Sequence, residues 1–226
     1  GGTCVNVGCV PKKLYVYGSE FGKAFKDAQG FGWSVDGVAF DWPTLRENKT
    51  REISRLNSIY DRLLDGSGAQ VINGMAKLID AHTVEVNGMQ YHAKKILLAT
   101  GSWPTKPDFP GNELAITSNE IFDLEVFPKR LLVIGGGYIA TEFACIFNGL
   151  GSQVVQLYRG DLFMRGFDED IRKFAADEIR KTGVDLRFNN NIVALARTEN
   201  GLEAQLSDGS SITTDAVLCA TGRHPN

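Results

Sequence analysis

The chain has 226 residues, of which 43% are apolar and 23% are charged, and its formal net charge is −3. This composition is typical of a globular protein with one large core or two small ones. The chain lacks the basic excess of a nucleic-acid-binding protein, and no apolar run has the length of a membrane span. We therefore expect neither nucleic acid nor a membrane as a partner.

Two cysteines, Cys4 and Cys9, open the chain in a segment that also contains Pro11 and two lysines. Because proline is tolerated in the first turn of a helix, we expect the pair where a loop enters a helix over residues 10–27. Nearby cations and the positive end of that helix are expected to lower the pKa of a cysteine. Two thiols at this spacing can form and break a disulfide, which predicts redox chemistry.

Two other interpretations of the cysteine pair have less support. A zinc site needs a second pair of ligands at metal-binding spacing, which the sequence does not contain, so we expect no metal. A purely structural disulfide is typical of secreted proteins, whereas Cys145 and Cys219 lie singly in apolar runs and resemble buried apolar residues. We expect a cytoplasmic protein.

The first half of the chain is predicted to contain two helices followed by short strands. Apolar spacing predicts a second helix over residues 42–65, beginning at Asp41 or Trp42. Strands are expected at 70–72, 76–80, 83–86 and 90–92, with a hairpin turn at Asn87-Gly88, and at 95–99 as a buried strand closed by Thr100 and Gly101.

Residues 102–130 are rich in proline and are predicted to link two domains. Beyond them, strands are expected at 131–135, 153–158, 185–188, 192–198, 202–206, 211–213 and 216–220, with helices at 137–150 and 168–182. Alternating strands and helices predict an α/β fold with a parallel sheet, into which a small β-meander is inserted near the end.

A glycine-rich turn joins the strand at 131–135 to the helix that follows it. Gly135 permits the tight turn, and Gly137 lets a pyrophosphate approach the backbone. Ala140 takes the position of close packing between helix and strand, and the helix N-terminus faces the anion. In this context the glycine pattern predicts a dinucleotide-binding unit.

The end of the next strand distinguishes the two nicotinamide cofactors. An acidic residue roughly 20 positions on would bind the free ribose 2′-hydroxyl of NAD. Here the strand ends in Tyr158-Arg159, and Arg165 follows. Guanidinium groups suit a 2′-phosphate, which a carboxylate would repel, so we expect NADPH. The alternative is that both arginines are solvated surface charges.

Residues 1–13, the turn and helix at 135–142, and the run from Arg159 through Arg165-Gly166-Phe167-Asp168 together resemble the flavin-dependent disulfide reductase family, and within it the glutathione reductases. The resemblance extends over essentially the whole chain and implies Rossmann-like FAD- and NAD(P)-binding domains. It implies a partial FAD-binding domain with the redox dithiol at 1–101, a linker at 102–130 and an NADPH-binding domain at 131–226. The dimerisation domain would be absent, and we expect an inactive fragment of a homodimeric protein.

The resemblance also implies an order of electron transfer, from NADPH to FAD, then to the Cys4/Cys9 disulfide and finally to glutathione disulfide. Cys9 would be the sulfur beside the flavin and Cys4 the thiol that attacks the substrate. Lys12 would pair with Glu142 near the flavin, although sequence alone would place Glu142 on a helix surface. Tyr138 would cover the nicotinamide pocket.

Further positions follow from the resemblance alone. FAD contacts are implied for Thr3 and Ala76, and a place beside the flavin for Lys12 and Glu142. NADPH contacts are implied for Gly135, Gly137, Tyr138, Ile139, Ala140, Arg159, Arg165 and Arg223. Further cofactor-binding positions are Thr100 and Gly101, in the family's turn after the last strand of the FAD domain, and Gly222, while Ile59 and Tyr60 would contact glutathione.

Two rival functions remain open at this point. The first is another NADPH-dependent flavin disulfide reductase, acting on trypanothione or a similarly bulky thiol. Trypanothione reductases share the dithiol and Arg-Gly-Phe-Asp patterns, whereas Ile59-Tyr60 favours glutathione. The second is a non-catalytic NADPH-binding module whose cysteines form a regulatory switch.

Overall fold

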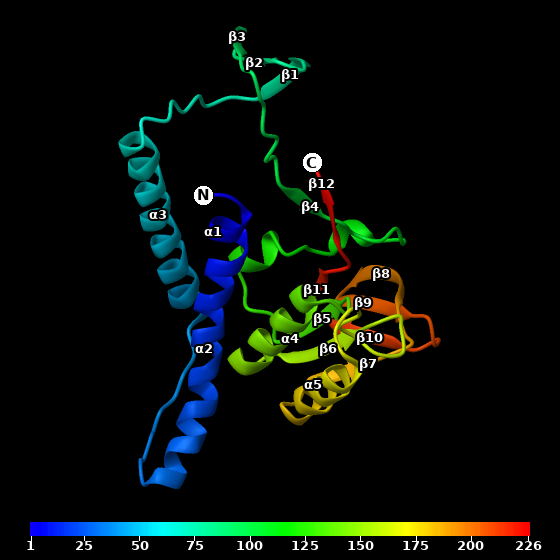
Figure 1. Ribbon diagram of the computed structural model, residues 1–226. Coiled ribbons are helices and arrows are strands. Elements are labelled where there is room, and N and C mark those ends of the chain that lie inside the picture. The colour runs from blue at the N-terminus through cyan, green and yellow to red at the C-terminus, as the bar shows by residue number, and fades with distance from the viewer.

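Three helices form the N-terminal part of the computed structural model, which describes residues 1–226 (Figure 1). A short helix, α1 (Thr3–Val7), leads through Gly8 into α2 (Cys9–Ala28), and α3 (Trp42–Gly66) packs beside α2. The predicted start of α3 is confirmed, because the Asp41 side chain accepts a hydrogen bond of 2.8 Å from the Thr44 amide. The expected loop around Cys4 is wrong, since this residue already lies in a helical turn.

A small antiparallel sheet follows these helices. It consists of β1 (Ala76–Asp80), β2 (Thr83–Val86) and β3 (Met89–His92). The predicted hairpin turn is confirmed, because Asn87 and Gly88 both have left-handed backbone angles, with φ of 54° and 79°. In Figure 1 this sheet lies at the end of two extended connections.

Two predicted strands do not form. Residues 70–72 and 95–99 are extended but have no hydrogen-bonded neighbour, and Leu97, expected to be buried, is 89% exposed. A strand is stable only where an adjacent strand satisfies its backbone N–H and C=O groups. The apolar composition of 95–99 is that of a buried strand, but no other segment of residues 1–226 lies beside it.

The segment between 102 and 130 contains short elements that pack against the rest of the chain. Strand β4 (Ser102–Pro104) pairs with β12 (Arg223–Pro225), and neither was predicted. Two 3₁₀ turns, Asn112–Leu114 and Glu120–Asp123, complete the segment. Ile121 in the second turn is fully buried.

The remaining elements form the predicted α/β unit, with bounds close to those expected. They are β5 (Arg130–Ile134), α4 (Tyr138–Leu150), β6 (Gln153–Leu157), α5 (Glu169–Lys181), β7 (Asp185–Arg187), β8 (Ile192–Thr198), β9 (Gly201–Leu206), β10 (Ser211–Thr214) and β11 (Ala216–Cys219). Four strands pair in parallel in the order β11-β5-β6-β7, and the meander has the order β10-β9-β8. The predicted fold class is therefore confirmed.

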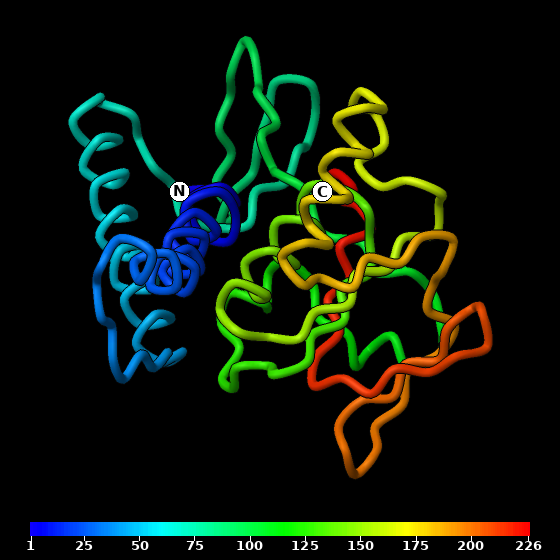
Figure 2. The backbone as a smooth tube through the Cα atoms, turned by 90° about the horizontal axis from the view of Figure 1, so that it is seen from below, coloured from blue at the N-terminus to red at the C-terminus, as the bar shows by residue number.

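Alternate residues of β5 contribute to two apolar cores. Leu131 and Val133 pack with α4 and α5, and this core extends to Tyr15 and Trp42 on the N-terminal helices. Leu132 and its neighbours on the other face pack against β8 and β9. The parallel sheet thus lies between a helical layer and the meander, and Figure 2 shows α2 and α3 on the helical side. No helix has the length and apolarity needed to cross a membrane.

Helices α2 and α4 approach closely because glycine lies at their crossing. A Cβ atom added to Gly149 would lie 2.9 Å from both the Cβ and the carbonyl oxygen of Ser19. We therefore expect Gly149→Ala to destabilise the protein by about 1–2 kcal/mol, because the clash outweighs the gain in helix propensity. Urea unfolding measures this. The matched control is Gly66→Ala, where an added Cβ meets nothing within 4 Å; equal stability changes in the two variants would contradict the close packing.

Candidate active site

The two cysteines lie at the junction of α1 and α2, where both are exposed free thiols. Gly8 separates the two helices, and a Cβ atom on it would lie 2.7 Å from the Thr3 carbonyl oxygen. Only glycine lets the two helix ends approach in this way. The segment is also fixed to α3, because Asn57 donates a hydrogen bond of 2.7 Å to the Asn6 side chain.

The Cys9 thiol has a raised pKa, which corrects the expectation that its surroundings would lower it. A hydrogen bond with the Cys4 side chain has the largest effect, and partial burial and the charge of Cys4 act in the same direction. Lys12 lowers the pKa, as predicted, but its effect is smaller. At neutral pH a smaller fraction of Cys9 is therefore thiolate than in an isolated cysteine, and the neighbouring Cys4 side chain is the largest cause.

We expect Cys4→Ala to lower the pKa of Cys9, because the hydrogen bond and the charge that raise it are both removed. In reduced protein, the pH dependence of alkylation at Cys9 should then shift toward lower pH. Replacing Cys145, which lies outside this pair, serves as the control. An unchanged or higher midpoint in Cys4→Ala would show that Cys4 does not control the thiol.

Lys12 and Glu142 form an ion pair between α2 and α4, as predicted, with 2.5 Å between Lys12 Nζ and Glu142 Oε2. The two side chains are 22% and 38% exposed. Lys12 Nζ also lies 5.9 Å from the centre of the Tyr138 ring. The pair therefore joins α2, which begins at Cys9, to the first turns of α4.

A cavity of about 330 Å³ lies between the dithiol and α4. It gathers seven predicted site residues, which are Thr3, Cys4, Cys9, Lys12, Tyr138, Ile139 and Arg223. The lining also includes Val7, Gly8, Ser102, Ser118, Phe122 and Phe143, which were not predicted. A more open hollow of about 410 Å³ on the hairpin sheet is lined by none of the predicted residues.

Arg223 lies on the wall of this cavity and is held by two serines. Its Nε donates to Ser102 Oγ at 2.8 Å and its Nη2 to the Ser102 carbonyl at 2.6 Å, while Nη1 lies 3.3 Å from Ser118 Oγ. No local pattern in the sequence indicates these contacts, because they join positions more than 100 residues apart.

The glycine turn has the expected geometry. Gly135 has a φ of 141°, and an added Cβ would lie 2.3 Å from the Ala220 carbonyl oxygen, so only glycine fits there. Ala140 is fully buried and lies against Gly135, which is the predicted packing. The backbone amides of Gly136 and Gly137 donate to no protein acceptor.

The carbonyls of the same turn are all occupied by protein donors. Gln156, buried on β6 and not singled out from the sequence, donates to the Gly135 carbonyl at 3.0 Å. The Met164 amide donates to the Gly136 carbonyl at 2.5 Å, and the Thr141 amide to the Gly137 carbonyl at 3.1 Å. With its acceptors satisfied and two donors free, the turn can bind an anion.

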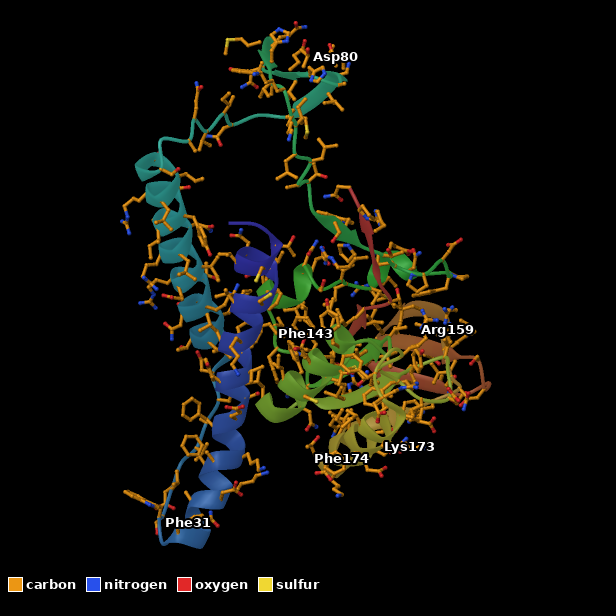
Figure 3. The ribbon with its side chains drawn as sticks, viewed as in Figure 1. Phe31, Asp80, Phe143, Arg159, Lys173 and Phe174 are labelled. Carbon is orange, nitrogen blue, oxygen red and sulfur yellow. The ribbon has the colours of Figure 1, made fainter.

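Arg159, which is labelled in Figure 3, begins the loop at 159–167 two residues after the end of β6, and Arg165 lies further along the same loop. Both side chains are exposed, and neither forms an ion pair. Two unpaired guanidinium groups on one loop can bind a phosphate.

The other predicted positions lie outside the cavity. Ala76 begins β1, and Tyr60 is 43% exposed on α3, together with Ile59. Thr100 Oγ1 lies 3.4 Å from the Asn226 carbonyl oxygen, and the Gly222 carbonyl accepts a hydrogen bond from the Thr105 amide. Gly101 lies near Thr3, because a Cβ atom added to Gly101 would be 4.0 Å from Thr3 Oγ1. No three His, Cys, Asp or Glu side chains come together in the structure.

Comparison with known proteins gives consistent matches over the whole chain. Residues 1–226 match the family described as pyridine nucleotide-disulphide oxidoreductase. The chain is 47% identical to a glutathione reductase of Burkholderia cepacia, with all of the chain and 50% of the relative aligned. It is 42% identical to a trypanothione reductase of Leishmania donovani, with 98% of the chain and 48% of the relative aligned.

A solved structure with the same fold is that of an HOCl-induced flavoprotein disulfide reductase from Escherichia coli. The TM-score is 0.85 at 30% identity, with all of this chain and 49% of that chain covered. The chain thus spans about half the length of the relatives that it matches.

Proposed function

The chain belongs to the pyridine nucleotide-disulphide oxidoreductase family, and on that basis we propose that it forms the dithiol-bearing and NADPH-binding part of a glutathione-disulfide reductase. The relatives support a disulfide reductase function. The observation that carries the proposal is the cavity in which Cys4 and Cys9 meet Lys12, the cation that pairs with Glu142, and the start of α4.

The residues of the glycine turn and of the following loop fit NADPH. Gly136 and Gly137 offer two free amides at the N-terminus of α4, which suits a pyrophosphate. Arg159 and Arg165 offer unpaired charge for a 2′-phosphate. Tyr138 and Arg223 would lie on the nicotinamide side, because both line the cavity at the dithiol.

The cavity at the dithiol fits the reactive end of FAD. It presents apolar walls at Ile139 and Phe143 and one ammonium group, that of Lys12. FAD, when bound, would supply the two-electron carrier between the nicotinamide and the dithiol. The Lys12 ammonium would stabilise negative charge there, and Glu142 would hold that ammonium in place.

The proposed substrate step is thiol–disulfide exchange in two stages. The Cys4 thiolate attacks one sulfur of glutathione disulfide, forming a mixed disulfide and releasing one glutathione thiolate. The Cys9 thiolate then attacks the Cys4 sulfur, which releases the second glutathione and leaves the Cys4–Cys9 disulfide. Two electrons have then passed to the substrate, and the Cys4–Cys9 disulfide has to be reduced again before the next cycle, for which the bound cofactors would supply the reducing power.

Glutathione is proposed over trypanothione because of Ile59-Tyr60 on α3. This helix is bonded to the dithiol segment through Asn57, which lies within one turn of Tyr60. The exposed Tyr60 ring therefore lies on a helix attached to the dithiol segment, where it would be able to contact a disulfide substrate bound at Cys4.

We further propose that residues 1–226 are part of a longer, homodimeric polypeptide and have no turnover alone. The chain covers about half of each relative, and the apolar run at 95–99 has no neighbouring strand. The native polypeptide should therefore have roughly twice the mass of this chain, as mass spectrometry of the protein isolated from its source can establish.

The experiment that tests the function compares substrates in the full-length protein loaded with FAD. NADPH oxidation is followed with glutathione disulfide or trypanothione disulfide as acceptor. We expect kcat/KM for glutathione disulfide to be at least about 100-fold higher. A preference for trypanothione would overturn the substrate proposal. NADPH binding without turnover of either would favour the regulatory switch.

A further inference from the structure

The loop at 159–167 is held in place by an arginine from the next helix. Arg172, in the first turns of α5, donates from Nε to the Phe163 carbonyl at 2.7 Å and from Nη2 to the Leu162 carbonyl. The guanidinium group is half-buried and forms no ion pair. Two adjacent carbonyls of the loop are thus bound by one rigid, forked donor.

A second anchor follows directly along the loop. Met164 has a φ of 55°, a conformation that non-glycine residues adopt only where their surroundings hold them. Its amide donates to the Gly136 carbonyl, and its sulfur accepts a hydrogen bond of 3.8 Å from Thr141. The loop is therefore joined to the glycine turn at the residue after the two carbonyls that Arg172 binds.

Arg165 follows Met164, so its position depends on this strained link. We propose that Arg172 is a positioning residue for cofactor selection, which fixes the loop so that Arg159 and Arg165 are held beside the glycine turn. The inference rests on the proposed NADPH function and adds a residue to it. Arg172 acts on the backbone of the loop, because its planar guanidinium group binds two adjacent carbonyls at once.

The alternative is that Arg172 merely contributes positive charge to the phosphate site. Both of its bonded groups are backbone carbonyls, which occupy Nε and Nη2. A lysine would keep the charge but could not bind two adjacent carbonyls in a planar fork. Arg172→Lys therefore separates geometry from charge.

The test measures binding, in the full-length protein, of adenosine 2′,5′-bisphosphate and of AMP by isothermal titration. In Arg172→Ala we expect the affinity for adenosine 2′,5′-bisphosphate to fall about tenfold, with AMP affinity changed by less than about twofold. Arg172→Lys should lose most of the same affinity. Adding Arg165→Ala to either variant should reduce the affinity for adenosine 2′,5′-bisphosphate by a smaller factor than Arg165→Ala does in the wild-type protein, because the two residues act on one phosphate contact.

Lys173→Ala is the matched control, since this neighbouring residue pairs only with Glu169 on the exposed face of α5. Its affinities for both ligands should be unchanged. Full affinity for adenosine 2′,5′-bisphosphate in Arg172→Lys would overturn the positioning role and assign the effect to charge. The ratio of the affinities for adenosine 2′,5′-bisphosphate and AMP gives a second criterion. If Arg159→Ala/Arg165→Ala removes the preference for the bisphosphate but Arg172→Ala leaves this ratio unchanged, the positioning role is also overturned. If that double variant keeps the ratio as well, the NADPH proposal itself fails.

Discussion

Replacing Cys9 by serine is expected to lower the rate of disulfide reduction by roughly 10³-fold or more, because the exchange cycle cannot be completed without its second sulfur. A mixed disulfide formed at Cys4 would then have no internal thiol to resolve it. The geometry supports this, since both cysteines line the same cavity. The measurement is NADPH oxidation with glutathione disulfide in the full-length protein.

Cys4→Ser should be as inactive as Cys9→Ser. Mass spectrometry should find a stable glutathione adduct at Cys4 in the Cys9→Ser variant and no such adduct in the Cys4→Ser variant. The control is Cys145→Ser, since this half-buried thiol on α4 lies outside the cavity and burial raises its pKa. Its rate should remain within about twofold of the wild type. A Cys9→Ser variant that still turns over would contradict the exchange mechanism.

Removing both loop arginines is expected to weaken the preference for NADPH over NADH strongly. In Arg159→Ala/Arg165→Ala we expect the preference for NADPH over NADH, as a ratio of kcat/KM values, to fall by roughly 10²-fold, because two charge-assisted contacts to the 2′-phosphate are lost. NADH, which lacks that phosphate, should be used as well as before. The readout is steady-state kinetics with each cofactor at saturating disulfide.

An arginine elsewhere on the surface controls for the change in net charge. Arg197, exposed on β8, forms no ion pair, and Arg197→Ala should leave the preference unchanged. A double variant that still prefers NADPH by the original ratio would show that Arg159 and Arg165 are only solvated charges, and the phosphate would then have to be bound elsewhere.

Local patterns predicted those parts of the fold that depend on neighbouring residues. The turn at Gly135 and Gly137 could be recognised because its φ requirement and its place between strand and helix are visible in a few positions. The hairpin at Asn87-Gly88 and the cap at Asp41 are of the same kind. Each of these three features depends only on residues a few positions away along the chain.

Features that depend on distant residues could not be predicted in this way. The contact of Arg223 with Ser102 and Ser118, and that of Gln156 with Gly135, join positions far apart in the chain. The strand expected at 95–99 failed for the same reason, since composition cannot show whether a neighbouring strand is present.

The pKa of Cys9 illustrates a third limit. The sequence shows both the lysine that lowers it and the cysteine that raises it, but only their positions in the structure decide which effect is larger. The Lys12–Glu142 pair was expected from family resemblance, and its geometry could not have been derived from spacing.

In the proposed cycle, electrons from NADPH arrive at Cys4 and Cys9. The most direct test oxidises the full-length, FAD-loaded protein, adds one equivalent of NADPH without oxygen, and maps alkylated thiols by mass spectrometry. Cys219, fully buried with its pKa raised to about 11 by burial, serves as an internal reference that should stay unlabelled. We expect NADPH to make both Cys4 and Cys9 accessible to alkylation; no gain of label at these two residues would contradict the proposed electron path.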